Sequence, residues 1–212
     1  MILAVFVDRM ILSSVILSYL NIFGAFTVAI LIAAGESAFV LFILSRPRTA
    51  SLRASPPFGW TLGLGIGSMQ ACVLIFRLFD EELAYSGYSG VNLISLSLAT
   101  TIALCSCLGH ALLGCWQGAQ LLESNRLRPF VMSTVYRGAL TVCIVLALFT
   151  PFTLIAVLPG LALAWSKAQS SWLLSGMTPA AKQAYRRTTR QSMRHKAASD
   201  SRIKGEYVDS DE

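Results

Sequence analysis

The stretch "LISLSLATTIALCSCLGHALLGCWQGAQLL", residues 93–122, contains no Asp, Glu, Lys or Arg along its whole length. A helix needs about 20 predominantly apolar residues to cross a hydrocarbon layer about 30 Å thick. The stretches 60–79 and 138–165 are similar, with at most one charged residue in each. Because their apolar residues are continuous and do not alternate with polar ones, these stretches predict membrane-spanning helices instead of barrel strands.

The composition of the whole chain agrees with this interpretation. Of its 212 residues, 55% are hydrophobic and 13% are charged, and the mean hydropathy is +0.63. A soluble domain has roughly a quarter of its residues charged. Backbone polar groups in a bilayer must find partners inside the protein, which only helices and closed barrels achieve. We therefore predict an all-α, polytopic helical membrane protein with about four transmembrane helices.

The charged segments between the apolar stretches predict the orientation. The predicted loops 45–59 and 123–137 each carry three Arg, whereas the segment 80–92 carries three acidic residues and no basic one. Short basic loops stay on the cytoplasmic side, so both Arg loops are expected there and 80–92 on the opposite side. Arg outnumbers Lys by 13 to 4, which favours a GC-rich genome. We expect an integral, multi-pass protein of a bacterial inner membrane.

The amino-terminal part is too long for one upright span. Residues 11–44 form an apolar stretch that would measure about 51 Å as a helix. We place the crossing at 22–44 and predict that 1–21 lies at the interface or extends the helix, with a second crossing as the alternative. No removable secretory signal is expected, because no positive charge precedes the apolar residues and no small-x-small cleavage site follows them.

The carboxyl end poses a problem of parity. One span at 138–165 would leave the tail outside, yet the basic segment 182–196 favours a cytoplasmic tail. Pro159-Gly160 predicts a turn, after which 161–174 would return as a short span or half-helix. We predict a transmembrane bundle over 22–177 and a cytoplasmic tail, basic and then acidic, over 178–212.

Small residues recur at every fourth position on three of the predicted spans. Such stripes let the backbones of neighbouring helices approach closely. The first span has Ala25, Ala29 and Ala33 at this spacing. The helix-packing residues predicted on the second and third spans are Gly59, Gly63, Gly67, Ala71, Gly114 and Gly118.

Glu36 is an acid deep inside an apolar stretch. At 100° per residue it shares a helix face with Ala25 and Ala29, so we expect it inside the bundle. The alternative places it at the cytoplasmic interface. With the third span taken to run from Leu93 to near Gln117, His110 lies at a similar predicted depth, about 10 Å from the inner end against about 12 Å for Glu36. We predict a hydrogen bond or ion pair between Glu36 and His110, acting as interhelical glue or as part of a proton path.

All five cysteines fall inside predicted spans. Cys107 and His110 share a helix face, and Cys72 is a candidate third ligand at similar depth. Zinc sites need three or four protein ligands, and the chain has no C-x-x-C pair for disulfide exchange. We therefore expect packing roles for the cysteines, with neither metal nor cofactor.

The tail begins with Thr178-Pro179, a helix-capping residue followed by proline at the first helical position. Eight Lys or Arg residues follow, with Asp200 the single acid before Glu206. An anionic lipid surface or an acidic protein is the expected partner. Nucleic acid has little support, because no aromatic residues interleave with the charges. The basic residues assigned to this surface are Arg186, Arg187, Arg190, Arg194 and Lys196.

The predicted loops and tail are too short for a soluble catalytic domain, and no catalytic motif is present. The leading interpretation is therefore a non-enzymatic subunit or accessory factor of a larger membrane assembly. It would bind a membrane-protein partner, or further copies of itself, through small-residue helix faces and its basic tail. A small transporter or channel component using Glu36 and His110 is the alternative, followed by a Cys/His-dependent membrane enzyme.

Overall fold

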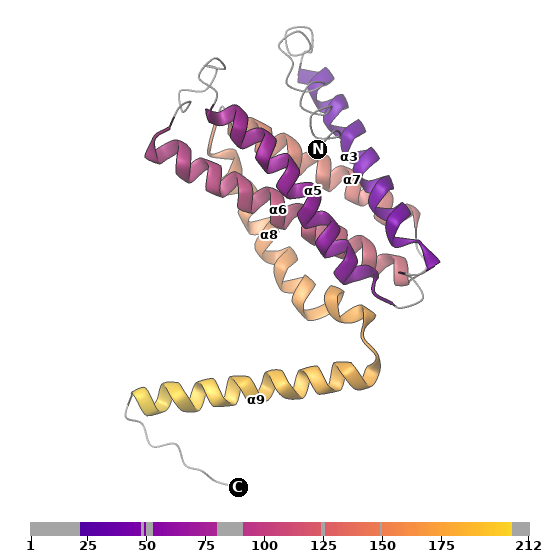
Figure 1. The fold of residues 1–212 in the computed structure, drawn as a ribbon, viewed down its shortest axis with the longest axis vertical. Helices are drawn as coiled ribbons and strands as arrows, with labels where there is room; N and C mark the ends of the chain where they lie inside the picture. Colours follow the sequence, from indigo (N-terminus) through magenta and orange to yellow (C-terminus); the bar gives the residue numbers. More distant parts are fainter. Residues whose placement is uncertain are drawn as a thin grey trace. The chain divides into compact units, whose positions relative to one another are not determined.

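The computed structural model describes residues 22–47, 49, 53–79, 91–123, 126–148 and 150–204. Within these ranges the chain forms helices and no strand. The predicted interfacial segment 1–21 and most of the acidic segment 80–92 lie outside them. The long helices are α3 (Ile22–Leu44), α5 (Ser55–Phe79), α6 (Leu93–Leu122), α7 (Leu127–Ala147), α8 (Thr153–Lys167) and α9 (Pro179–Ile203) (Figure 1).

Four of these helices are long and apolar enough to cross a membrane: α3, α5, α6 and α7. This confirms the predicted fold class, an all-α polytopic membrane protein. The chain divides into two compact units, Met1–Gly176 and Met177–Glu212. The first contains α3 to α8 and the second contains α9.

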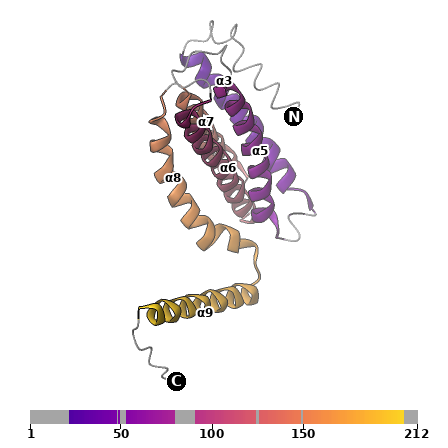
Figure 2. The ribbon, with the colours of Figure 1, turned by 60° about the vertical axis from the view of Figure 1, so that its left-hand side comes forward.

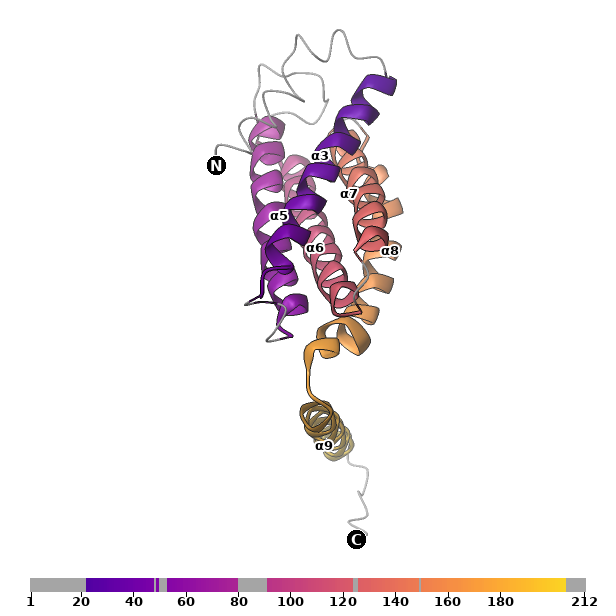
Figure 3. The same cartoon turned by 90° about the vertical axis from the view of Figure 1, so that its right-hand side faces the viewer.

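The first unit is a bundle in which α6 contacts α5, α7 and α8, while α3 packs mainly against α7 (Figure 3). Its hydrophobic core is formed where α5, α6, α7 and α8 meet, and the surface of the spans exposes large apolar side chains, as lipid contact requires. The best-buried core residues include Leu78, Ile102, Cys105, Ile144 and Ala147.

Helices α5 and α6 pack backbone to backbone through their glycines. A Cβ atom added to Gly59 would overlap the carbonyl group of Gly114, and one added to Gly63 would overlap that of His110. Gly67 faces the backbone of Ser106 and Cys107, and Gly118 that of Ser55 and Pro56. Ala71 is also buried. Only glycine permits such close helix contact, so the α5 stripe is fully occupied by α6.

The predicted loop 123–137 is wrong. Helix α7 already begins at Leu127, so only residues 123–126 connect it to α6. Pro129 lies in the first turn of α7, where a proline removes no intrahelical hydrogen bond. Arg137 is consequently not at a membrane edge but at the eleventh of the 21 positions of α7.

The predicted turn at Pro159-Gly160 is also wrong. Helix α7 ends at Ala147, and Pro159 lies inside α8. The turn lies around Pro151, where the hydroxyl group of Thr153 donates a hydrogen bond to the carbonyl oxygen of Cys143 at 3.0 Å. A π-helical turn (Ala168–Trp172) and a 3₁₀ turn (Leu173–Gly176) follow α8 directly.

This helical segment, 153–176, runs back along the bundle to the end at which α5 begins (Figure 2). The ring of Trp165 lies 5.5 Å from that of Trp60, and Gly176 lies against the carbonyl group of Arg53 and the ring of Pro56. The return is therefore longer than the predicted 161–174. It brings the chain out of the bundle beside the Arg-containing connection between α3 and α5.

Candidate functional site

Arg137 is the largest fully buried side chain in the described part of the chain, with 0% of its surface exposed. It is ten residues from either end of α7, or about 15 Å along the helix axis. A charged side chain near the middle of a membrane costs about 3 kcal/mol or more unless it is compensated. The neighbours of Arg137 therefore define the candidate site.

Two helices supply those neighbours. From α6, the Nδ1 atom of His110 lies 3.0 Å from Nη1 of Arg137, and Oε1 of Gln117 accepts a hydrogen bond from Nη2 at 3.1 Å. From α3, Oε2 of Glu36 lies 3.8 Å from Nη1 and 3.7 Å from Nδ1 of His110. Glu36 thus supplies the opposite charge without a direct hydrogen bond.

Arginine can only donate hydrogen bonds, and this sets the direction of the first arm of the network. Nδ1 of His110 must accept from Arg137, so the neutral ring carries its proton on Nε2. Nε2 donates to Oε1 of Gln70 at 2.6 Å, and Nε2 of Gln70 donates to Oγ1 of Thr141 at 3.2 Å. The hydroxyl group of Ser106 lies within reach of both Oε1 of Gln70 and the carbonyl oxygen of Gly67.

The second arm begins at Gln117. Because its Oε1 accepts from Arg137, its Nε2 is left to donate, and it lies 2.6 Å from the hydroxyl oxygen of Ser133 and 3.3 Å from the carbonyl oxygen of Ser37. The hydroxyl group of Ser133 then donates to the carbonyl oxygen of Phe130 at 3.2 Å. Together the two arms connect α3, α5, α6 and α7 through one buried cation.

Glu36 is the most accessible member of the ionic centre. Its side chain is 15% exposed, whereas those of His110 and Arg137 are 0% exposed. Within the described residues, its Oε2, the Nε of Arg137 and the hydroxyl oxygen of Ser37 are buried without a hydrogen-bond partner. The charges of Glu36 and Arg137 therefore balance each other at short range, but no direct hydrogen bond joins the two side chains. This leaves the ion pair weaker than a bidentate contact.

The structure thus brings the predicted residues Glu36 and His110 together, but it adds Arg137 between them. Sequence reasoning missed Arg137 because it ended the loop at that residue. A signal was present: Ser133, Arg137 and Thr141 recur at every fourth position and form one polar stripe on α7. Gln70 and Gln117 were not predicted either, because a neutral amide inside an apolar stretch does not stand out as a charged residue does.

The cysteines do not join this site. Cys72 lies on the exposed surface of α5, while Cys105 and Cys115 are buried. In the ranges that the structure describes, no three His, Cys, Asp or Glu residues lie close enough to hold a metal ion. Cys72 therefore does not complete the three-ligand set considered with Cys107 and His110.

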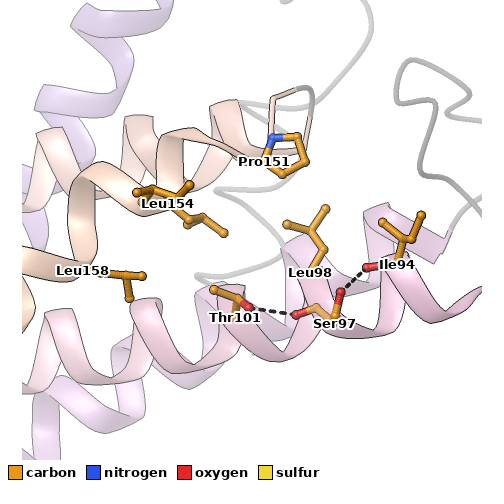
Figure 4. Close-up of a pocket in the computed structure, with 8 residues that line it drawn as sticks. Ile94, Ser97, Leu98, Thr101, Pro151, Leu154 and Leu158 are labelled. Atoms are coloured by element: carbon orange, nitrogen blue, oxygen red, sulfur yellow. Dashed lines mark hydrogen bonds between the residues drawn. The ribbon is translucent and has the colours of Figure 1, made fainter.

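A shallow apolar hollow between α6 and α8 is separate from the polar network (Figure 4). The hydroxyl groups of Ser97 and Thr101 border it, but they donate to the carbonyl oxygens of Ile94 and Ser97 in their own helix. The remaining lining residues are apolar, among them Leu98, Pro151 and Leu154. It offers a ligand no free hydrogen-bond donor.

Fold and site define the class of the protein as an integral, multi-pass helical membrane protein with a buried arginine-centred network. No protein-family model matches the chain, and neither a curated protein nor a solved structure matches it.

Proposed function

We propose that the protein is a non-enzymatic subunit or accessory factor of a larger membrane assembly in a bacterial inner membrane. The observation that carries this proposal is a second small-residue face on α5, on the side away from α6. Thr61, Gly65, Ser68 and Cys72 are all exposed and fall within about 60° of one another on the helix. A Cβ atom added to Gly65 would meet no described atom within 4 Å.

This face, the outer α5 face, differs from the rest of the lipid-facing surface. Elsewhere the bundle exposes large side chains such as Phe39, Phe42 and Leu104, while Phe76 continues the outer α5 face one turn beyond Cys72. Lipid tails are as apolar as leucine, so helices in a bilayer associate through close packing and polar contacts, and interfaces between them are rich in small residues. The outer α5 face has the composition of such an interface.

The hydroxyl groups on the outer α5 face are compatible with lipid before a partner arrives. The hydroxyl group of Thr61 donates to the carbonyl oxygen of Phe58 at 3.0 Å, and the hydroxyl group of Ser68 donates to the carbonyl oxygen of Gly65 at 2.9 Å. Their oxygens still have lone pairs to accept a hydrogen bond from a neighbouring helix. A transmembrane helix of a partner, or of a second copy, fits this surface.

Site-specific photo-crosslinking tests the proposal in native membranes. A photoreactive amino acid at Ser68 is expected to give one protein adduct of discrete mass. The same amino acid at Phe42, an exposed position on α3, serves as the matched control and is expected to give lipid adducts. Lipid adducts alone from both positions would refute the docking role of this face.

A small transporter or channel component is the second candidate, and the partial exposure of Glu36 beside Arg137 and His110 favours it. It predicts that the purified protein, reconstituted in liposomes as a homogeneous homo-oligomer, supports a pH-dependent flux that Glu36→Gln abolishes. The subunit proposal predicts no flux from the isolated protein, since the buried centre would serve to hold the helices together.

A further inference from the structure

Helix α9 is a 25-residue helix whose residues are all described, and none of them is buried. Its start is well defined. The hydroxyl oxygen of Thr178 accepts a hydrogen bond from the backbone N–H of Ala181 at 3.3 Å, and Pro179 occupies the first helical position. A helix of this length without a buried face gains little from packing, so its surface chemistry must explain what it does.

Most of the charge on α9 gathers on one side. At 100° per residue, Lys182, Arg186, Arg187, Arg190 and Arg194 fall within an arc of about 140°, called here the basic arc. Lys196 and Arg202 lie outside it. Asp200 is the only acid between residues 178 and 205. Near the opposite side lie uncharged residues such as Ala184 and Thr188.

The chain enters this helix directly from the bundle. Gly176, the last residue of the first unit, lies against the carbonyl group of Arg53. Only Met177 and Thr178 separate it from Pro179, so the Cα atoms of Gly176 and Pro179 are three residue steps apart, at most about 11 Å. Helix α9 therefore begins almost directly after the membrane-spanning unit along the chain.

We infer that α9 docks on the anionic lipid headgroups of the leaflet at the Gly176 end of the bundle, through the basic arc. Charge complementarity and the short connection support a lipid surface as the occupant, because clustered Lys and Arg beside a transmembrane segment are attracted by anionic headgroups. Protein interfaces instead depend on clustered aromatic and apolar anchors. The exposed large apolar residues of α9 do not form such a cluster. Met193 lies inside the basic arc, and Tyr185 and Ile203 are far apart along the helix.

Hydrogen exchange of the full-length protein in lipid nanodiscs tests this inference. Docking selects the helical form of the tail, so it must slow amide exchange across 179–203. We expect exchange to be at least about fivefold slower in discs with about one third phosphatidylglycerol than in pure phosphatidylcholine discs. Raising the salt to about 0.5 M should remove the difference, because the attraction is screened.

Two variants of equal net charge separate the basic arc from charge in general. The arc variant, Arg186→Gln with Arg190→Gln and Arg194→Gln, should lose the protection. The control, Thr188→Glu with Gln191→Glu and His195→Glu, changes the opposite face by the same charge and should keep most of it. Equal exchange in both disc types, or protection that survives in the arc variant, would overturn the inference. So would protection by soluble polyglutamate in phosphatidylcholine discs without any protection by phosphatidylglycerol, since that result would point to an acidic protein.

Discussion

Arg137 of α7 donates a hydrogen bond from Nη1 to Nδ1 of His110 on α6 at 3.0 Å, and neither side chain has any exposed surface. This contact fixes the tautomer of the imidazole. Through His110 it orients the amide of Gln70, whereas Nη2 of Arg137 orients that of Gln117, and the two arms together join α3, α5, α6 and α7. Arg137 is a donor-only group, so it sets the donor and acceptor roles of His110 and Gln117 and, through His110, that of Gln70.

Removal of Arg137 should be costly, and the cost should be partly reversible by a second substitution. Arg137→Met leaves the Glu36 carboxylate without its counter-charge, and we expect a loss of about 3 to 5 kcal/mol in unfolding free energy. The double variant Arg137→Met with Glu36→Met should be more stable than Arg137→Met alone, because it leaves no uncompensated buried charge. Thermal unfolding in one mild detergent compares the original protein, the two single variants Arg137→Met and Glu36→Met, and the double variant. A double variant that loses the sum of both single losses would contradict the charge-compensation argument.

The partners of His110 should differ in coupling energy. Double-mutant cycles with His110→Ala should give a coupling of about 1 kcal/mol or more with Gln70→Ala, because the Nε2–Oε1 contact of 2.6 Å is a hydrogen bond. The cycle with Glu36→Gln should give a smaller value, since the closest approach of 3.7 Å lies outside hydrogen-bond range. Equal coupling in both cycles would show that the charge of Glu36 acts on the ring as strongly as a hydrogen bond does.

Two glycines on the same helix should respond in opposite ways to one added methyl group. Gly63→Ala should destabilise the bundle by about 2 kcal/mol or more, because the new Cβ atom would overlap the His110 backbone. Gly65→Ala should be neutral or slightly stabilising, since its Cβ atom meets open space and alanine favours the helix. The unfolding temperature of the two variants in detergent measures this difference, and equal destabilisation would contradict the packing of α5 on α6.

Gly65→Leu should act on assembly instead of folding. The bulky side chain fills the outer α5 face and should reduce the crosslink from Ser68 while leaving the unfolding temperature of the isolated protein unchanged. Gly35→Leu is the matched control, because Gly35 is an exposed glycine of α3 that also faces open space. A crosslink that survives Gly65→Leu would place the partner on another face.

Cysteine labelling in intact cells should establish the orientation. A membrane-impermeant maleimide should label Val91→Cys, which lies at the start of α6 and is 89% exposed, but neither Thr49→Cys nor Ser199→Cys. The basic connection around Thr49 is expected in the cytoplasm. The 153–176 return brings the chain out of the bundle on that same side. Labelling of Ser199→Cys from outside would contradict the return of this segment through the bundle.

Proline explains most of the differences between the predicted and observed elements. Pro56 and Pro129 were assigned to loops, yet both lie in the first turn of a helix, where a missing N–H has no consequence. Pro159 was assigned to a turn, yet it lies within α8. Local sequence alone does not show whether a proline begins a helix or ends one, because the residues next to the proline are similar in the two cases.

The sequence by itself determined the fold class, the bounds of α3, the start of α6, and the glycine stripe on α5. These features follow from local requirements: the thickness of the hydrocarbon layer and the need of each span to satisfy its own backbone hydrogen bonds. Only the tertiary structure decided which of the two small-residue faces of α5 is occupied, where 153–176 runs, and that Arg137 is an interior residue. An arginine is tolerated inside a membrane only where neighbouring helices supply acceptors and a carboxylate, and those come from residues far away in the sequence.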